Sequence, residues 1–129
     1  MSKNVKKVQE QCAGRYGGIL PPTVRSLSMA YIADYDRRRL IVERGEARGR
    51  DEPRFRRVNA VVDSAIASVL DMHGISGEAA EVIANDLKSG TGSRSARAVS
   101  QVGSFLSRKY YVEIRDDVLW FVARGLNLL

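Results

Sequence analysis

SARAVSQVGSFLSRKYYVEIRDDVLWFVARGLNLL, which is residues 95–129, is the stretch that decides the fold predicted for this chain. Its apolar side chains recur every three or four positions in two segments, 95–106 and 108–125, and this is the period of an amphipathic helix. The segments meet at a short Ser-Arg-Lys junction, so the two helices must cross at a steep angle. That geometry is typical of a helix-turn-helix, in which the second helix reads DNA.

Helical periodicity also runs through most of the remaining sequence. Residues 1–21 are the exception, and we expect a flexible basic arm there, followed by a single helical domain over 22–129. Gly74 stands where a left-handed residue would end a long central helix. The predicted fold class is all-α, with about five helices and a helix-turn-helix-like C-terminal pair over 95–125. The helices are expected near residues 22–44, 53–73, 76–88, 95–106 and 108–125.

Positive charge is unevenly spread along the 129 residues, whose net charge is +6. Residues 1–57 carry 14 basic and 7 acidic side chains, residues 58–88 carry 1 and 5, and residues 89–129 carry 6 and 3. Two basic regions therefore flank an acidic middle, and this asymmetry favours a polyanionic partner such as nucleic acid. Positive charge that serves solubility alone is the alternative.

The titratable residues argue against catalysis. Cys12 is the only cysteine and His73 the only histidine, so neither a disulfide nor a cysteine or histidine metal cluster is expected, and no cofactor is implied. The adjacent carboxylates Asp116 and Asp117 diverge by about 100° on a helix and form no acid-base pair. We expect a binding protein rather than an enzyme. Without a signal peptide or a membrane span in the sequence, it should be cytoplasmic.

The candidate nucleic-acid-binding residues gather around the start of the last helix. Arg108 and Lys109 stand in its first turn, where positive charge opposes the helix dipole, so local stability does not explain them. A helix that presents its N-terminal residues to bases and phosphates would explain them. The predicted DNA contacts are Arg94, Arg97, Ser107, Arg108, Lys109, Tyr111 and Arg115, with phosphate contacts from Lys3, Lys6, Lys7 and Arg15 in the arm.

Three carboxylates on the same helix oppose this interpretation. Glu113, Asp116 and Asp117 would repel a phosphate chain if they faced it. Either they lie on the flank away from DNA, or the helix meets a protein.

The sequence also resembles a known family in two places. The opening of the last helix and the ending of the chain are similar to small phage and prophage transcription regulators of the ArpU and RinA type, and 31–45 (YIADYDRRRLIVERG) is similar to their N-terminal helix. Together the matching stretches cover less than half of the chain. The resemblance implies activation of late phage genes through DNA binding in a bacterial host cell. The matching C-terminal positions are Ser107, Arg108, Tyr110, Tyr111, Ala123, Leu126 and Leu128.

Two functional hypotheses follow. The first is a transcription regulator that binds double-stranded DNA. The second is a protein-binding module, such as a phage-encoded inhibitor of a host nucleic-acid enzyme. The apolar ending, residues 126–129, either folds back on the core or forms a homodimer contact.

Overall fold

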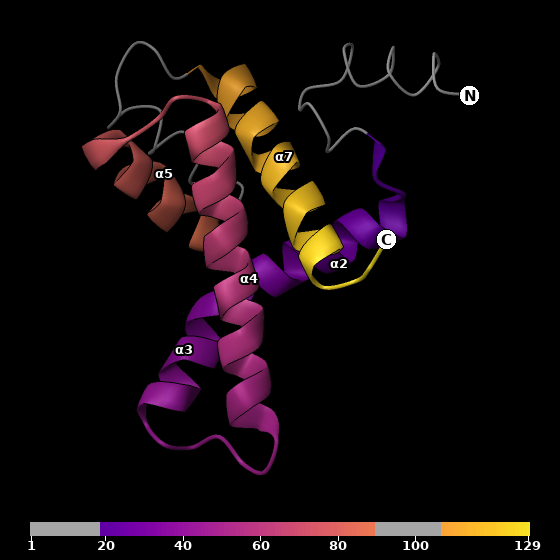
Figure 1. The fold of residues 1–129 in the computed structure, drawn as a ribbon, viewed down its shortest axis with the longest axis vertical. Coiled ribbons are helices and arrows are strands. Elements are labelled where there is room, and N and C mark those ends of the chain that lie inside the picture. The colour runs from indigo at the N-terminus through magenta and orange to yellow at the C-terminus, as the bar shows by residue number, and fades with distance from the viewer. Residues whose placement is uncertain (1–18, 90–106) are drawn as a thin grey trace.

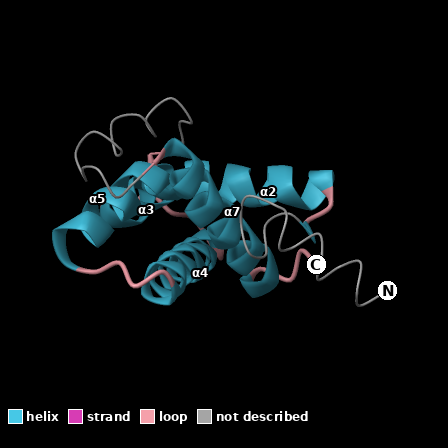
Figure 2. Ribbon diagram, turned by 90° about the horizontal axis from the view of Figure 1, so that it is seen from above, coloured by secondary structure: helices cyan, strands magenta, loops and turns pink. Residues whose placement is uncertain are grey.

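The computed structural model describes residues 19–89 and 107–129, and in these ranges every regular element is a helix (Figures 1 and 2). The all-α prediction is confirmed. The helix expected over 95–106 lies outside the described residues, as does the arm up to residue 18, so the predicted helix pair is seen only through its second member. The helices are α2 (Pro22–Ala33), α3 (Tyr35–Glu43), α4 (Asp51–Met72), α5 (Gly77–Lys88) and α7 (Arg108–Gly125).

Helix α4 is the long axis of the molecule. Its 22 residues make it about 33 Å long. Helix α3 lies beside its first half, α5 and α7 lie beside its second half, and α2 crosses behind its middle (Figure 1). The α3–α4 hairpin, residues 35–59, therefore projects away from the part of the molecule that holds α5 and α7.

The helix predicted over 22–44 is two helices, because the chain breaks at Asp34. This residue ends α2 and precedes α3, with φ −92° and ψ 6°. The buried side chain of Arg38 donates a hydrogen bond to the main-chain carbonyl of Tyr31 at the end of α2, and another to Oδ1 of Asn59 on α4 at 2.7 Å. A guanidinium thus satisfies a carbonyl that the break leaves open.

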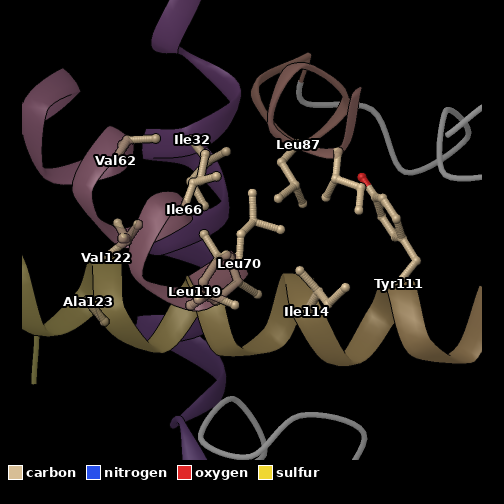
Figure 3. Packing of buried hydrophobic residues seen from close by; sticks show 14 of the residues in the cluster. Ile32, Val62, Ile66, Leu70, Leu87, Tyr111, Ile114, Leu119, Val122 and Ala123 are labelled. Atoms are coloured by element: carbon tan, nitrogen blue, oxygen red, sulfur yellow. The ribbon is translucent and has the colours of Figure 1, made fainter. Parts of the chain in front are cut away.

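The core forms where one face of α7 meets α2, α4 and α5. Ile114, Val118 and Val122 on α7 are fully buried, and they belong to one cluster with Val62 and Val69 of α4 (Figure 3). The end of α7 also approaches α4 closely. A Cβ atom at Gly125 would lie 2.6 Å from Cγ1 of Val61, so only glycine fits without a shift of the neighbouring side chain.

Most helix ends lie close to the positions that capping residues in the sequence predict. Gly74 has the expected left-handed φ of +69°, and the next amide, Ile75, donates to the carbonyl of Leu70 at 2.9 Å. Helix α4 begins at Asp51, two residues before the predicted start. Leu20 is buried in the core, so the chain is anchored before the predicted end of the arm at residue 21.

The apolar ending folds back on the core. Asn127 takes a left-handed φ of 58°, and the Leu128 amide donates to the carbonyl of Ala123 at 2.8 Å. Leu126 and Leu128 are partly buried and pack against the main cluster. Leu126 and Leu128 thus follow the first predicted alternative, whereas Leu129 is 60% exposed.

Candidate nucleic-acid interface

The first turn of α7 has the form that the sequence predicts. Ser107 precedes the helix, and its Oγ accepts a hydrogen bond from the Tyr110 amide at 3.0 Å, so it is a true N-cap. Arg108 and Lys109 are both exposed. Their charges are thus available to an anionic ligand at this end of the molecule.

Tyr111 does not belong to that exposed surface. Its ring reaches from α7 into the core toward α5 (Figure 3), its exposure is 4%, and its hydroxyl donates a hydrogen bond to the carboxylate of Asp86. Burial, reinforced by this hydrogen bond, raises the pKa of the Tyr111 hydroxyl. The prediction that Tyr111 contacts DNA is inconsistent with this position.

Arg115 is also less available than predicted. Its side chain is 28% exposed and lies beside Asp116, with Nη2 at 3.7 Å from Oδ1. Among the described residues, its buried Nε has no hydrogen-bond partner. Arg108, Val112 and Arg115 lie in one row along α7. Within this row, Arg108 carries the exposed positive charge, and Arg115 is close to Asp116.

Two of the three acidic residues of α7 point inward, and Glu113 is partly exposed. Asp116, 5% exposed, pairs with Arg25 of α2 at 2.5 Å. Asp117, fully buried, lies 3.0 Å from Nε2 of His73, whose Nδ1 is 3.1 Å from the Tyr110 hydroxyl. These contacts tie α7 to α2 and to the end of α4, and the repulsion that the sequence suggested does not arise from Asp116 or Asp117.

The other predicted contacts cannot be placed. Arg94, Arg97, Lys3, Lys6, Lys7 and Arg15 lie outside the described residues.

The α3–α4 hairpin carries a positive surface that the sequence analysis did not select. Residues 37–57 contain nine arginines against four acidic side chains. Several of these arginines have carboxylate partners one helical turn away. Arg39 contacts Glu43 at 3.1 Å, Arg56 contacts Glu52 at 3.3 Å, and Arg54 lies 3.9 Å from Asp51.

Four exposed arginines of this region have no ionic or hydrogen-bonding partner in the described part of the chain. Two of them, Arg50 and Arg57, also share one side of α4 with Arg54, because spacings of four and three bring residues to the same helix face. This row extends over about 10 Å. We call the four the hairpin arginines: Arg44, Arg48, Arg50 and Arg57.

A signal for this surface was present in the sequence. The arginines of residues 37–57 outnumber the carboxylates that stand three or four positions away, so some had to remain unpaired. The net charge of the first 57 residues pointed to the same region, but the interpretation assigned it to the arm and to the last helix.

Comparison with protein families, with curated proteins and with solved structures found no match to this chain. Functional interpretation therefore rests on the geometry above. In residues 19–89 and 107–129, no three histidine, cysteine or acidic side chains gather in a way that could hold a metal ion. No helix in these ranges has the length and apolar character needed to cross a membrane.

Proposed function

We propose that the protein binds double-stranded DNA and that the hairpin arginines make its main phosphate contacts. The observation that carries this proposal is the set of four exposed, unpaired guanidinium groups at the projecting end of α4. Guanidinium groups bind phosphate oxygens in pairs of parallel hydrogen bonds, which makes arginine well suited to a DNA backbone. The finer proposal, regulation of transcription, is supported by the resemblance of residues 31–45 and of the C-terminal stretch to phage regulators.

Fold stability gives no reason for the hairpin arginines. Like charges that stand close together on a surface repel one another and destabilise the folded chain. Partners for them at helical spacing would have removed this cost, as Glu43 does for Arg39 and Glu52 does for Arg56. A polyanionic ligand supplies the missing counter-charge.

The hairpin arginines and a second exposed basic group, Arg108 and Lys109, lie near opposite ends of α4 (Figure 1). The hairpin arginines surround its N-terminal end, and His73 at its C-terminal end contacts Tyr110, which follows Arg108 and Lys109. The length of α4, about 33 Å, is close to one turn of B-DNA. In this proposal the two groups contact one duplex about a turn apart.

Fluorescence anisotropy with a labelled duplex of about 30 base pairs, measured from low to high salt, tests the proposal. The double variant Arg48→Ala/Arg57→Ala should bind more weakly, and its salt slope should be smaller by about 2, because each lost phosphate contact lowers the slope by about 0.9. The matched control is Arg39→Ala/Arg56→Ala, which removes the same charge from arginines that already have partners. The control should bind more tightly than the test variant.

Equal binding by these two variants would show that only net charge matters. No binding by the wild type at low salt would exclude a DNA-binding function and favour the protein-binding alternative.

The role of α7 is tested separately. If its first turn reads bases at a specific site, Arg108→Ala should cost about 1–3 kcal/mol at that site and less at other sequences. A uniform loss at every sequence would reduce Arg108 to a phosphate contact.

A further inference from the structure

A second surface lies at the break between α2 and α3. It is an open groove of about 590 Å³ between α2, α3 and the start of α4. Its walls include Leu27, Ala30 and Tyr31 of α2, and Phe55 and Val58 of α4. This volume falls within the range of about 300–1,000 Å³ that is usual for ligand sites.

The groove has an apolar interior and a cationic rim, in which three arginines outnumber one carboxylate although Arg37 pairs with Asp34 and Arg54 lies 3.9 Å from Asp51. Arg37 and Arg54 line the groove, with side chains 57% and 70% exposed, and the guanidinium carbon of each lies 5.6 Å from the centre of the Phe55 ring. Asp34 is the only acidic residue among the lining residues of this described groove. Arg37 holds it through two hydrogen bonds of 2.7 and 2.5 Å, which lower the pKa of the Asp34 carboxyl.

Two large apolar side chains of α2 are exposed. Leu27 and Met29 are each 44% exposed. Leu27 lines the groove, whereas Met29 is not among the lining residues. A half-exposed leucine beside exposed arginines indicates a surface that gains from burial by a partner with both apolar and acidic groups.

The positive charge of the rim distinguishes among the possible occupants of the groove. A DNA backbone would match the arginines but would gain nothing from the apolar interior. The parts of this chain outside the described residues are themselves basic. Residues 1–18 carry four basic side chains and one acidic, and residues 90–106 carry two and none. The cationic rim would repel both segments.

We propose that the groove between α2, α3 and the start of α4 docks a short amphipathic segment of a partner protein, with apolar side chains flanked by carboxylates. The apolar side chains fill the space beside Leu27, Tyr31 and Phe55, and the carboxylates meet Arg37 and Arg54. Short amphipathic helices are commonly held in this way, through anchors spaced at three or four residues. The inference does not rest on DNA binding, because the hairpin arginines are not among the lining residues.

The test titrates the full-length chain with three labelled peptides of about 15 residues, the length of about four helical turns. The first peptide has leucine and phenylalanine at helical spacing with flanking glutamates. The second replaces the apolar residues by serine, and the third replaces the glutamates by lysine. The first should bind at least about tenfold more tightly than either of the others.

Two variants locate the binding. Leu27→Asp should weaken binding of the first peptide by about tenfold or more, and Arg37→Ala should weaken it by a smaller factor. Met29→Asp is the matched control, because Met29 is equally exposed on the same helix but does not line the groove. It should bind more tightly than Leu27→Asp, and all three variants should keep the helical circular-dichroism spectrum of the wild type.

Several results would overturn the proposal: no binding of the first peptide at millimolar concentration, equal binding of the serine peptide, or equal losses in Leu27→Asp and Met29→Asp. Sedimentation of the wild type tests the remaining possible occupant, a second copy of this chain. Self-association that Leu27→Asp abolishes and Met29→Asp keeps would assign the groove to a second copy of this chain. DNA binding is measured on the same variants, so failure of the groove and failure of the DNA interface are distinguishable.

Discussion

Charged side chains serve different purposes in the two halves of this molecule. Around the second half of α4, two carboxylates are buried and each has a definite partner: Asp116 pairs with Arg25, and Asp117 with His73. In the α3–α4 hairpin, every guanidinium group except that of Arg38 is exposed, and those of Arg44, Arg48, Arg50 and Arg57 have no partner in the described ranges. The first set connects helices, and the second is available to a ligand.

This difference shows why charge summed along a sequence is a poor guide to a surface. Residues 58–88 are the acidic middle of the chain, yet two of their five carboxylates have partners within the protein. Asp63 contacts Lys88 at 2.7 Å and accepts a hydrogen bond from the Tyr35 hydroxyl at 2.9 Å, and Asp86 accepts one from Tyr111. Only the charge that remains after such pairing acts on a partner.

The largest effect expected is on stability, when a buried carboxylate is removed. Asp117→Ala should lower the free energy of unfolding by about 3 kcal/mol, because Asp117 is fully buried and its loss leaves His73 without its partner. Urea unfolding followed by circular dichroism measures this change. Glu52→Ala, which removes a carboxylate from an exposed pair, is the control and should cost less than about 0.5 kcal/mol. Similar losses of unfolding free energy in both variants would contradict the proposed difference between the buried carboxylates near the second half of α4 and the exposed charges of the hairpin.

The three consecutive arginines Arg37, Arg38 and Arg39 allow a buried charge to be compared with exposed charges within one helical turn. Arg38→Ala should cost about 2 kcal/mol, because Arg38 is buried and its loss leaves the Tyr31 carbonyl and Asn59 without a donor. Arg39→Ala, which breaks only exposed pairs, should cost less than about 0.5 kcal/mol, and Arg37→Ala, which also loses the contact with the Phe55 ring, less than about 1 kcal/mol. The same unfolding measurement separates them. If all three variants unfolded alike, Arg38 would not be the link that fixes α3 to α4.

Alkaline pH tests the Tyr111–Asp86 contact. The pKa of Tyr111 is raised in the folded state, so the folded chain retains this proton more strongly than the unfolded chain. The resulting stability is fully present below the unfolded pKa of about 10 and is lost as pH rises above it. Tyr111→Phe should lower stability by about 1 kcal/mol at neutral pH. It should also reduce the decline above pH 10 by about 1.4 kcal/mol per pH unit. An unchanged decline in Tyr111→Phe would assign the alkaline effect to other tyrosines.

The smallest effect belongs to the hairpin arginines. Arg48→Ala and Arg57→Ala should change the free energy of unfolding by no more than about 0.5 kcal/mol, since neither has a partner to lose in the described chain. Thermal unfolding at low salt is the sensitive measurement, because removal of a repelling charge should raise rather than lower the midpoint. A marked loss of stability would mean that these arginines are structural.

Periodicity was sufficient to predict α4, α5 and α7, because each has apolar residues at helical spacing and a recognisable end such as Gly74 or Ser107. The break at Asp34 was not predictable in this way. The pattern of apolar residues continues through it, and what stabilises the break is Arg38 bonded to Asn59, 21 residues away.

The buried positions of Asp116 and Asp117 were hidden for a similar reason. Each is polar and was therefore placed on a surface, but each finds its partner through the fold, 91 residues away for Asp116 and 44 for Asp117. Tyr111 was assigned to DNA with the other residues that open the last helix, although it stands two positions after Lys109 and so points about 200° away from it on a helix. Sequence proximity thus located the right helix end but not the right side chain.

The unbroken course of α4 also has a mechanical consequence. Its second half is clamped in the core through Val62, Ile66 and Val69, while its first half extends outward with α3 as a cantilever. The outer part, from Asp51 to Val62, packs against α3 and is about 16 Å long. A change of about 10° in the curvature of the helix near Val62 displaces its outer end by about 3 Å. That displacement is close to the spacing of successive base pairs, about 3.4 Å. If the hairpin arginines bind DNA as proposed, a bend of this size would move their phosphate contacts by about one base pair while the second half of α4 stays in place.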